Sequence, residues 1–163
     1  MPYSLNQIKK VLNTFTLQIW GNKAVIPGDG WSLDAIASAL LKYCEECKID
    51  IVLALAQGIV ECHFGVNPSA SRSRKTHNIY NVGNVDSGNN HYFPTWEEGI
   101  KRYCQLMHNE YNWHDAPDDY VSLNSMREHD FTRPRGGRYA SAPNYTQTVW
   151  NIGQQILKLL EDK

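Results

Sequence analysis

Residues 53–65 read LALAQGIVECHFG, and the only carboxyl group in this stretch belongs to Glu61. Asp50 stands where it can cap a helix, and Gly65 stands where a helix can end. The helix expected between them, over about residues 51–63, is apolar almost all round, which is typical of a buried central helix. Burial disfavours the charged form of a carboxyl group and raises its pKa. The stretch therefore predicts a core helix whose last turn carries a partly desolvated acid.

Capping signals and apolar residues at helical spacing predict four further helices around this one. Two of them begin with a capping box, in which Ser4 pairs with Gln7 and Thr95 pairs with Glu98. A third follows Ser32. The apolar stripes of the four helices are Leu5, Ile8, Leu12 and Phe15; Leu33, Ile36, Ala37, Leu40 and Cys44; Ile100, Tyr103, Cys104, Met107 and Tyr111; and Val149, Ile152, Ile156, Leu159 and Leu160.

The segment over about residues 70–94 has a different composition, rich in Asn, Ser and Gly. Residues 77–82 (HNIYNV) and 91–93 (HYF) have strand-like content on either side of DSGNN, a plausible hairpin turn. We therefore expect an α+β fold that is mainly α, in which a helical body carries a small β-hairpin lobe. The 163 residues fit one domain, 1–163, with no separate wall-binding domain.

Charge, hydropathy and cysteine usage exclude several classes of protein. The net charge is −1 and the pI is near 6.6, which argues against nucleic-acid binding. The longest apolar run is about half of what a bilayer crossing needs, and the N-terminal residues lack the features of a signal peptide. We expect a chain made in the cytoplasm, without membrane insertion. CEEC (44–47) lacks the second half of a zinc site, so we expect no metal and no organic cofactor.

Three features of the sequence can carry chemistry. An acid that is still protonated near neutral pH, as expected for Glu61, is what cleavage of a glycosidic bond requires. Asp86, near the hairpin tip, is the best-placed second carboxylate for such a reaction. Tyr139, in an aromatic loop before the last helix, can stack on a sugar or donate to its acetamido group. Each has a structural reading as well: a solvent-facing or paired glutamate, an ordinary turn aspartate and a loop tyrosine that anchors a helix.

Four segments resemble, in the same order, motifs of the glucosaminidase family, glycoside hydrolase family 73, which includes flagellar-rod muramidase domains and many autolysins. LAQGIVECHFG (55–65) resembles the AQAALESGWG helix, and HNIYNVGN (77–84) resembles the NLFGIK strand. FPTWEEGIKRYCQLM (93–107) is similar to FxSxxESFxDYxxLL, and RYASAPNYTQTV (138–149) is similar to YATDPNYAxKI. The resemblance spans about residues 33–160 and implies a lysozyme-like fold.

The resemblance also implies roles for individual residues. Glu61 corresponds to the general acid of the family, and Tyr139 to the tyrosine of its YATDP segment, which lines the active site. Asn78 and Tyr80 fall on the strand that edges the cleft. The second acid of the family lies in the β-lobe at a variable position, so Asp86 is assigned by region.

Three further residues, Phe64, Asn84 and Tyr145, are expected to contact the substrate. The chain departs from the family pattern at two places. Residues 62–64 (Cys-His-Phe) replace Ser-Gly-Trp after the glutamate, and residues 141–142 (Ser-Ala) replace Thr-Asp. The first departure bears on a sugar subsite, and neither touches the proposed acid.

The resemblance implies a hydrolase that cleaves β-1,4 glycosidic bonds of bacterial peptidoglycan, most simply an endo-β-N-acetylglucosaminidase. A lytic transglycosylase or muramidase of the same fold remains open, as does a non-catalytic tail or baseplate protein that grips glycans. The absence of an export signal favours a bacteriophage lysin, monomeric, made in the host cytoplasm and released by a holin-type partner or carried in the virion. Either Asp86 activates water, or the 2-acetamido group of the substrate assists with Tyr139 orienting it.

Overall fold

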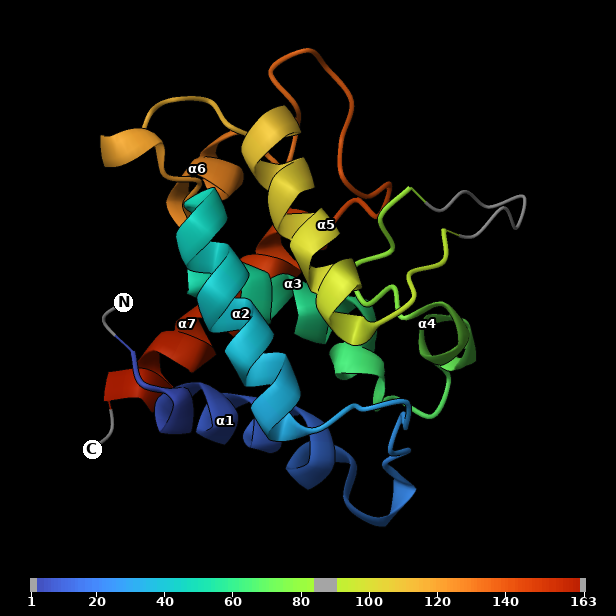
Figure 1. Ribbon diagram of the computed structural model, residues 1–163. Helices are drawn as coiled ribbons and strands as arrows, with labels where there is room; N and C mark the ends of the chain where they lie inside the picture. Colours follow the sequence, from blue (N-terminus) through green and yellow to red (C-terminus); the bar gives the residue numbers. More distant parts are fainter. Residues whose placement is uncertain (1–2, 84–90, 162–163) are drawn as a thin grey trace.

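The computed structural model describes residues 3–83 and 91–161, and its elements are helices joined by turns and loops (Figure 1). Helix α3 (Ile51–Cys62) lies at the centre. Helices α2 (Leu33–Cys47) and α7 (Tyr145–Glu161) pack against it, and α5 (Trp96–Glu110) packs against α2. Helix α1 (Leu5–Asn13) contacts both α2 and α7. The remaining elements are the short helices α4 (Ser71–Thr76) and α6 (Leu123–Glu128) and the single turns η1 (Thr14–Gln18), η2 (Gly21–Lys23), η3 (His63–Gly65) and η4 (Pro117–Asp119).

The central position of α3 follows from its sequence. Nine consecutive residues, Ile51–Ile59, are buried, so the helix has no solvent-facing stripe over most of its length. Asp50 caps it by accepting from the Val52 N–H at 3.0 Å, and its other oxygen accepts from the Leu123 N–H at 3.1 Å, which ties α6 to the start of α3. The prediction of a buried core helix capped by Asp50 is confirmed.

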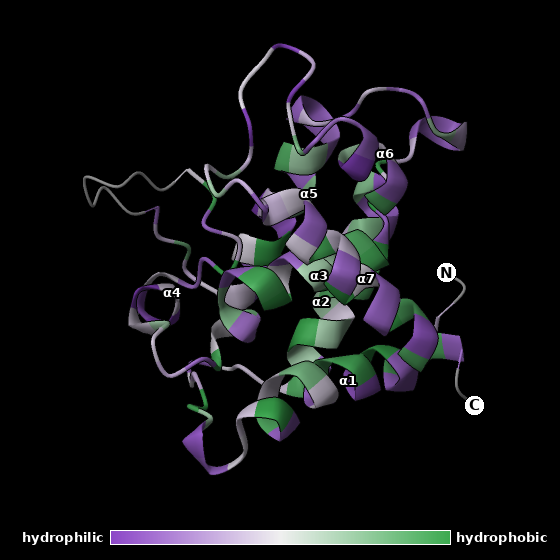
Figure 2. Cartoon of the chain, turned by 180° about the vertical axis from the view of Figure 1, so that it is seen from behind, coloured by the Kyte–Doolittle hydropathy of each residue, from purple (hydrophilic) through white to green (hydrophobic). Residues whose placement is uncertain are grey.

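The four other predicted helices also form. Ser4 and Gln7 make the expected capping box at α1, and the Ser32 hydroxyl accepts from the Ala35 N–H at the start of α2. The Thr95 hydroxyl likewise accepts from the Glu98 N–H at the start of α5. Seen from behind, hydrophobic residues gather where the helices face one another, while the connecting loops are mainly hydrophilic (Figure 2). No helix among the described residues is both long and apolar enough to cross a bilayer.

The β-hairpin lobe predicted over residues 70–94 does not form in the described part of this segment. The described part of this segment contains α4 and a series of turns, and no strand forms at 77–82 or 91–93. The reason is the side chain of Asn78, which accepts from the Val82 N–H at 3.0 Å and donates to the Val82 carbonyl at 2.9 Å. These bonds satisfy backbone groups that a strand partner would otherwise take. The expected hairpin tip, residues 84–90, lies outside the described residues.

Close packing at Gly58 joins α3 to the turn that follows it. The Phe64 ring is fully buried and lies against Gly58, where an added Cβ would meet the ring atom Cζ at 2.3 Å. Gly153, in α7, has a comparable approach of 2.4 Å, but to a terminal methyl group of Leu123. An aromatic ring held on all sides cannot shift as easily as one methyl group.

We therefore expect Gly58→Ala to lower the free energy of unfolding by about 2 kcal/mol, because overpacking outweighs the gain in helix propensity. Gly153→Ala is the matched control. It brings the same gain in helix propensity, about 1 kcal/mol, and requires only a shift of the Leu123 methyl group, so its free energy of unfolding should stay near that of the wild type. Urea unfolding of the three proteins measures both effects. Equal destabilisation by the two substitutions would contradict the packing described here.

Candidate active site

Glu61 occupies the last turn of α3, directly before the chain turns away from the helix axis. His63 and Phe64 both adopt left-handed backbone conformations, with φ of 50° and 54°. The His63 N–H bonds to the carbonyls of Gly58 and Ile59, which ends the helix. Two consecutive non-glycine residues with positive φ store backbone strain, and such strain is common at functional sites.

A chain of hydrogen bonds connects Glu61 to the core through three other helical residues. The Tyr145 hydroxyl donates to Glu61 Oε1 at 3.1 Å. Gln57 Nε2 donates to the Tyr145 oxygen at 3.0 Å, and the Tyr103 hydroxyl donates to Gln57 Oε1 at 2.5 Å. The four residues come from α3, α5 and α7, so packing of these helices fixes one oxygen of the carboxyl group.

Burial raises the pKa of Glu61 from 4.5 to about 7. Desolvation is the dominant cause, because the carboxylate form loses hydration among apolar neighbours. The hydrogen bond from Tyr145 and the positive charge of Arg72 act in the opposite direction and lower the pKa. The raised pKa expected from the sequence is thereby confirmed. The acid holds its proton in a substantial fraction of molecules at neutral pH.

Glu61 lines a cavity of about 270 Å³ between the end of α3 and α4. The other lining residues are mostly polar: Cys62, Asn67, Ser69, Ala70, Arg72 and Ser73. Arg72 also donates to the Asn81 side chain at 2.5 Å. A partly protonated acid, a guanidinium group and several hydroxyl and amide groups thus share one cavity, which suits a polar substrate.

The structure brings Tyr139 and Tyr145 together near Glu61. Their rings stack at a centroid distance of 5.9 Å, and the Tyr139 hydroxyl donates to the Tyr80 carbonyl at 2.6 Å. Tyr139 therefore lies beside the direct partner of Glu61, with its own hydroxyl engaged by backbone. Tyr145, expected as a substrate contact, bonds to the acid itself.

The other expected substrate contacts lie in the core or outside the described residues. Phe64 and Tyr80 have no exposed surface, and Asn78 is 1% exposed. Tyr80 donates to the Ala54 carbonyl at 2.9 Å and stacks on Tyr103, so it supports α3 from the side of α5. Asp86 and Asn84 lie outside the described residues.

Sequence reasoning missed Gln57 and Tyr103, which belong to the hydrogen-bond chain. Gln57 had a detectable signal. It is the one polar side chain within the apolar run and precedes Glu61 by four residues, so both project from the same side of α3. Tyr103 carried no such signal, because it occupies an ordinary core position on the stripe of its helix.

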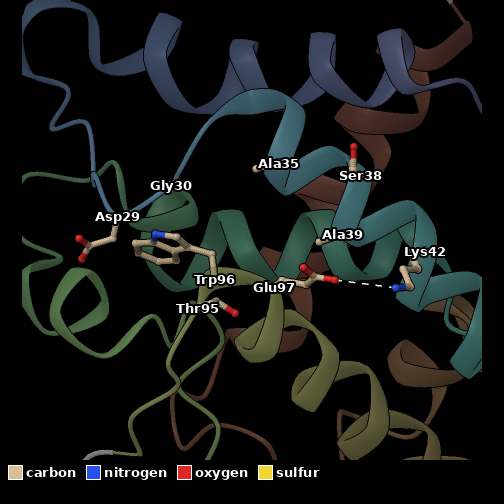
Figure 3. A pocket seen from close by; sticks show the side chains of 9 residues that line it. All are labelled: Asp29, Gly30, Ala35, Ser38, Ala39, Lys42, Thr95, Trp96 and Glu97. Carbon is tan, nitrogen blue, oxygen red and sulfur yellow. Dashed lines mark ion pairs between the residues drawn. The ribbon is translucent and has the colours of Figure 1, made fainter.

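A second cavity, of about 380 Å³, lies between the start of α5 and α2 (Figure 3). Its acids are Asp29 and Glu97, whose side chains are 71% and 55% exposed. Glu97 accepts from the Tyr43 hydroxyl at 2.7 Å and pairs with Lys42 at 3.9 Å. These hydrated carboxylates differ from the desolvated Glu61, so we assign acid chemistry to the cavity beside α4.

One group of residues in the described part of the chain has the composition of a metal site. Ligand atoms of Asp115, Glu128 and His129 lie within 4.8 Å of one another. His129 Nε2 already hydrogen-bonds to Asp115 at 2.8 Å, and the His129 ring stacks on Trp113 at 3.7 Å. These contacts account for the arrangement without an ion, and none of the three residues lines the Glu61 cavity.

Replacing Glu61 should stabilise the protein at alkaline pH. A pKa raised on folding means that the favourable contribution of the protonated acid is complete below pH 4.5 and is lost as pH rises through about 7. We expect Glu61→Gln to gain stability relative to the wild type over this range, by about 3 kcal/mol at most. Unfolding free energies at pH 4.5 and 8 measure the gain, with pH 4.5 as the internal reference. A constant difference would contradict a desolvated acid.

Comparison with known proteins identifies the family to which this chain belongs. Residues 37–158 match the family model named Glucosaminidase, described as mannosyl-glycoprotein endo-beta-N-acetylglucosaminidase. No curated protein and no solved structure gave a significant match. The matched region covers most of the chain and includes Glu61, Tyr139 and Tyr145, and it confirms the resemblance described above. The chain belongs to the glucosaminidase family and is a glycoside hydrolase that acts on glycans.

Proposed function

We propose that this protein hydrolyses β-1,4 glycosidic bonds of bacterial peptidoglycan after N-acetylglucosamine, with Glu61 as the general acid. The observation that carries the proposal is a desolvated carboxyl group with a pKa of about 7, fixed on one oxygen and lining a polar cavity. Such an acid can protonate a leaving oxygen near neutral pH. Residues 1–163 act together as one catalytic domain in this proposal.

In the proposed reaction, the proton of Glu61 passes to the glycosidic oxygen. The bond between this oxygen and the anomeric carbon breaks, and its electron pair stays on the leaving oxygen. The anomeric carbon develops oxocarbenium character, and water adds to it while one proton of the water passes to a base, either Asp86 or the Glu61 carboxylate. Glu61 leaves the bond-breaking step as a carboxylate, which the Tyr145 hydrogen bond and Arg72 stabilise, since both lower its pKa.

Two groups are candidates for activating water or for shielding the anomeric carbon. Asp86 serves as a general base, or the 2-acetamido group of the substrate assists while Tyr139 orients it. Support for Tyr139 comes from its place beside Tyr145, 5.9 Å away between ring centroids. Phe64, Asn78 and Tyr80 act from the core in this proposal, by holding the backbone around the cavity, while Asn84 remains a proposed substrate contact.

The biological setting that we propose is a bacteriophage lysin, active as a monomer, that reaches the wall with a holin-type partner or in the virion. The description of the family also names a mannosyl-glycoprotein substrate. The chemistry common to both is hydrolysis after an N-acetylglucosamine residue. A glycan-gripping tail protein is the non-catalytic counterpart, and loss of wall clearing on replacement of Glu61 separates it from an enzyme.

Glu61→Gln should reduce clearing of purified bacterial walls by about 100-fold or more, because the amide cannot supply a proton. Turbidity loss over time measures the rate. Glu97→Gln is the matched control: the acid of the other cavity is exchanged in the same way, and clearing should stay near the wild-type rate. Equal clearing by the wild type and Glu61→Gln, or no clearing by either, would sink the enzymatic proposal.

Mass spectrometry of the products identifies the bond and the reaction. New reducing ends on N-acetylglucosamine are the expected result. Reducing ends on N-acetylmuramic acid would indicate a muramidase, and 1,6-anhydro ends would indicate a lytic transglycosylase. Release of glycans from a mannosyl-glycoprotein, with no action on walls, would overturn peptidoglycan as the substrate.

The activity should decline as pH rises through about 7, because the general acid must be protonated in the free enzyme. Initial rates at substrate concentrations well below KM, from pH 5 to 9, give this alkaline limb of kcat/KM. A decline of kcat/KM centred near pH 4.5 would mean that Glu61 titrates like a hydrated glutamate and is not the general acid.

A further inference from the structure

We propose that the buried chain Tyr103–Gln57–Tyr145 determines which oxygen of Glu61 carries the transferable proton. Oε1 is held as an acceptor, so the proton resides on Oε2. The inference rests on the proposed function insofar as it assigns the proton to catalysis. It makes Tyr103, Gln57 and Tyr145 positioning residues, although only Tyr145 contacts the acid.

The direction of the chain follows from what each group can donate. Among the described residues, the Tyr145 hydroxyl contacts Gln57 and Glu61. Because Gln57 Nε2 can only donate, Glu61 Oε1 is the one acceptor left for the Tyr145 proton. Oε1 therefore receives a hydrogen bond and does not donate one.

The opposite direction would leave a buried group without a partner. In that arrangement the amide of Gln57 is turned round, so that its nitrogen donates to Tyr103 and its oxygen accepts from Tyr145. The Tyr103 hydroxyl has no other hydrogen-bond partner in the described part of the chain, so its proton would have no acceptor. Tyr103 is fully buried and stacks on Tyr80 at 3.6 Å, which prevents it from turning toward water. An unpaired buried hydroxyl is costly, so Tyr103 selects the observed direction.

Among the described residues, few other groups can affect the titration of Glu61. Facing it are Tyr145 from α7, Tyr139 from the loop before α7, Arg72 from α4, and Cys62 on α3 itself. Burial raises the pKa of Cys62 to about 11 and raises the pKa values of both tyrosines. Near pH 7 these three groups are neutral, so Arg72 is the charged neighbour of Glu61 in the described part of the chain. Arg72 is unchanged in the variants below.

The test is a titration of Glu61 in Tyr145→Phe and Tyr103→Phe. Tyr145→Phe removes the donor to Oε1, so the pKa of Glu61 should rise by about one unit. Tyr103→Phe leaves the direct contact intact but removes the penalty on the opposite direction. It should shift the pKa the same way by a smaller amount, because Tyr145 then donates to Gln57 part of the time.

Carbon-13 NMR of glutamate-labelled protein follows the carboxyl group directly, with Glu61→Gln to assign its signal. The alkaline limb of kcat/KM should move upward in parallel. Tyr111→Phe is the matched control, because Tyr111 is a buried tyrosine of the same cluster whose hydroxyl has no hydrogen-bond partner among the described residues. Its Glu61 titration should match the wild type.

If the pKa of Glu61 in Tyr103→Phe, or in Tyr145→Phe, equals the wild-type value, the inference is overturned. If Tyr103→Phe does not fold, Gln57→Met removes the same link and should also raise the pKa. The NMR titration needs no substrate, so the two proposals fail separately. A protein that shows the expected shifts but does not cleave peptidoglycan would overturn the proposed function and leave the hydrogen-bond direction standing.

Discussion

The enclosure of α3 is the constraint on which the rest of the structure depends. Nine successive buried residues leave most of the helix no surface for water, and Glu61 follows them in its last turn. Desolvation is the largest influence on the pKa of Glu61 and outweighs both the Tyr145 hydrogen bond and the charge of Arg72. The same burial that stabilises the core thus keeps the acid protonated near neutral pH.

Tyrosines give the site its rigidity. Tyr80 stacks on Tyr103 of α5, and Tyr139 stacks on Tyr145 at the start of α7. The Tyr139 hydroxyl joins the two pairs by donating to the Tyr80 carbonyl. The hydroxyl groups of Tyr80 and Tyr139 donate to backbone carbonyls, and those of Tyr103 and Tyr145 donate to Gln57 and Glu61. A tyrosine can fill core volume with its ring and still donate one directed hydrogen bond. Phenylalanine in these places would keep the packing and lose the direction of the polar chain.

Much of the fold could be predicted from the sequence because its signals are local. A capping serine, or an apolar residue every third or fourth position, acts within one helix, so Ser4, Ser32 and Asp50 mark helix starts correctly. The strand expected at 77–82 failed for a reason that is also local but is hidden in the sequence. Asn78 uses its side chain to satisfy Val82, and composition alone does not distinguish such a turn from a strand. The partner of Glu61 could not be predicted, since Tyr145 is 84 residues away and only helix packing brings the two together.

The position of α1 bears on where the independently stable part of this protein begins. The family match starts at residue 37, within α2, whereas α1 ends at Asn13. Yet Ile8, Val11 and Leu12 are completely buried, and α1 lies against both α2 and α7. A truncation made at the edge of the matched region would expose the apolar surfaces of α2 and α7 that α1 covers. The cooperative folding unit is therefore larger than the segment that defines the family.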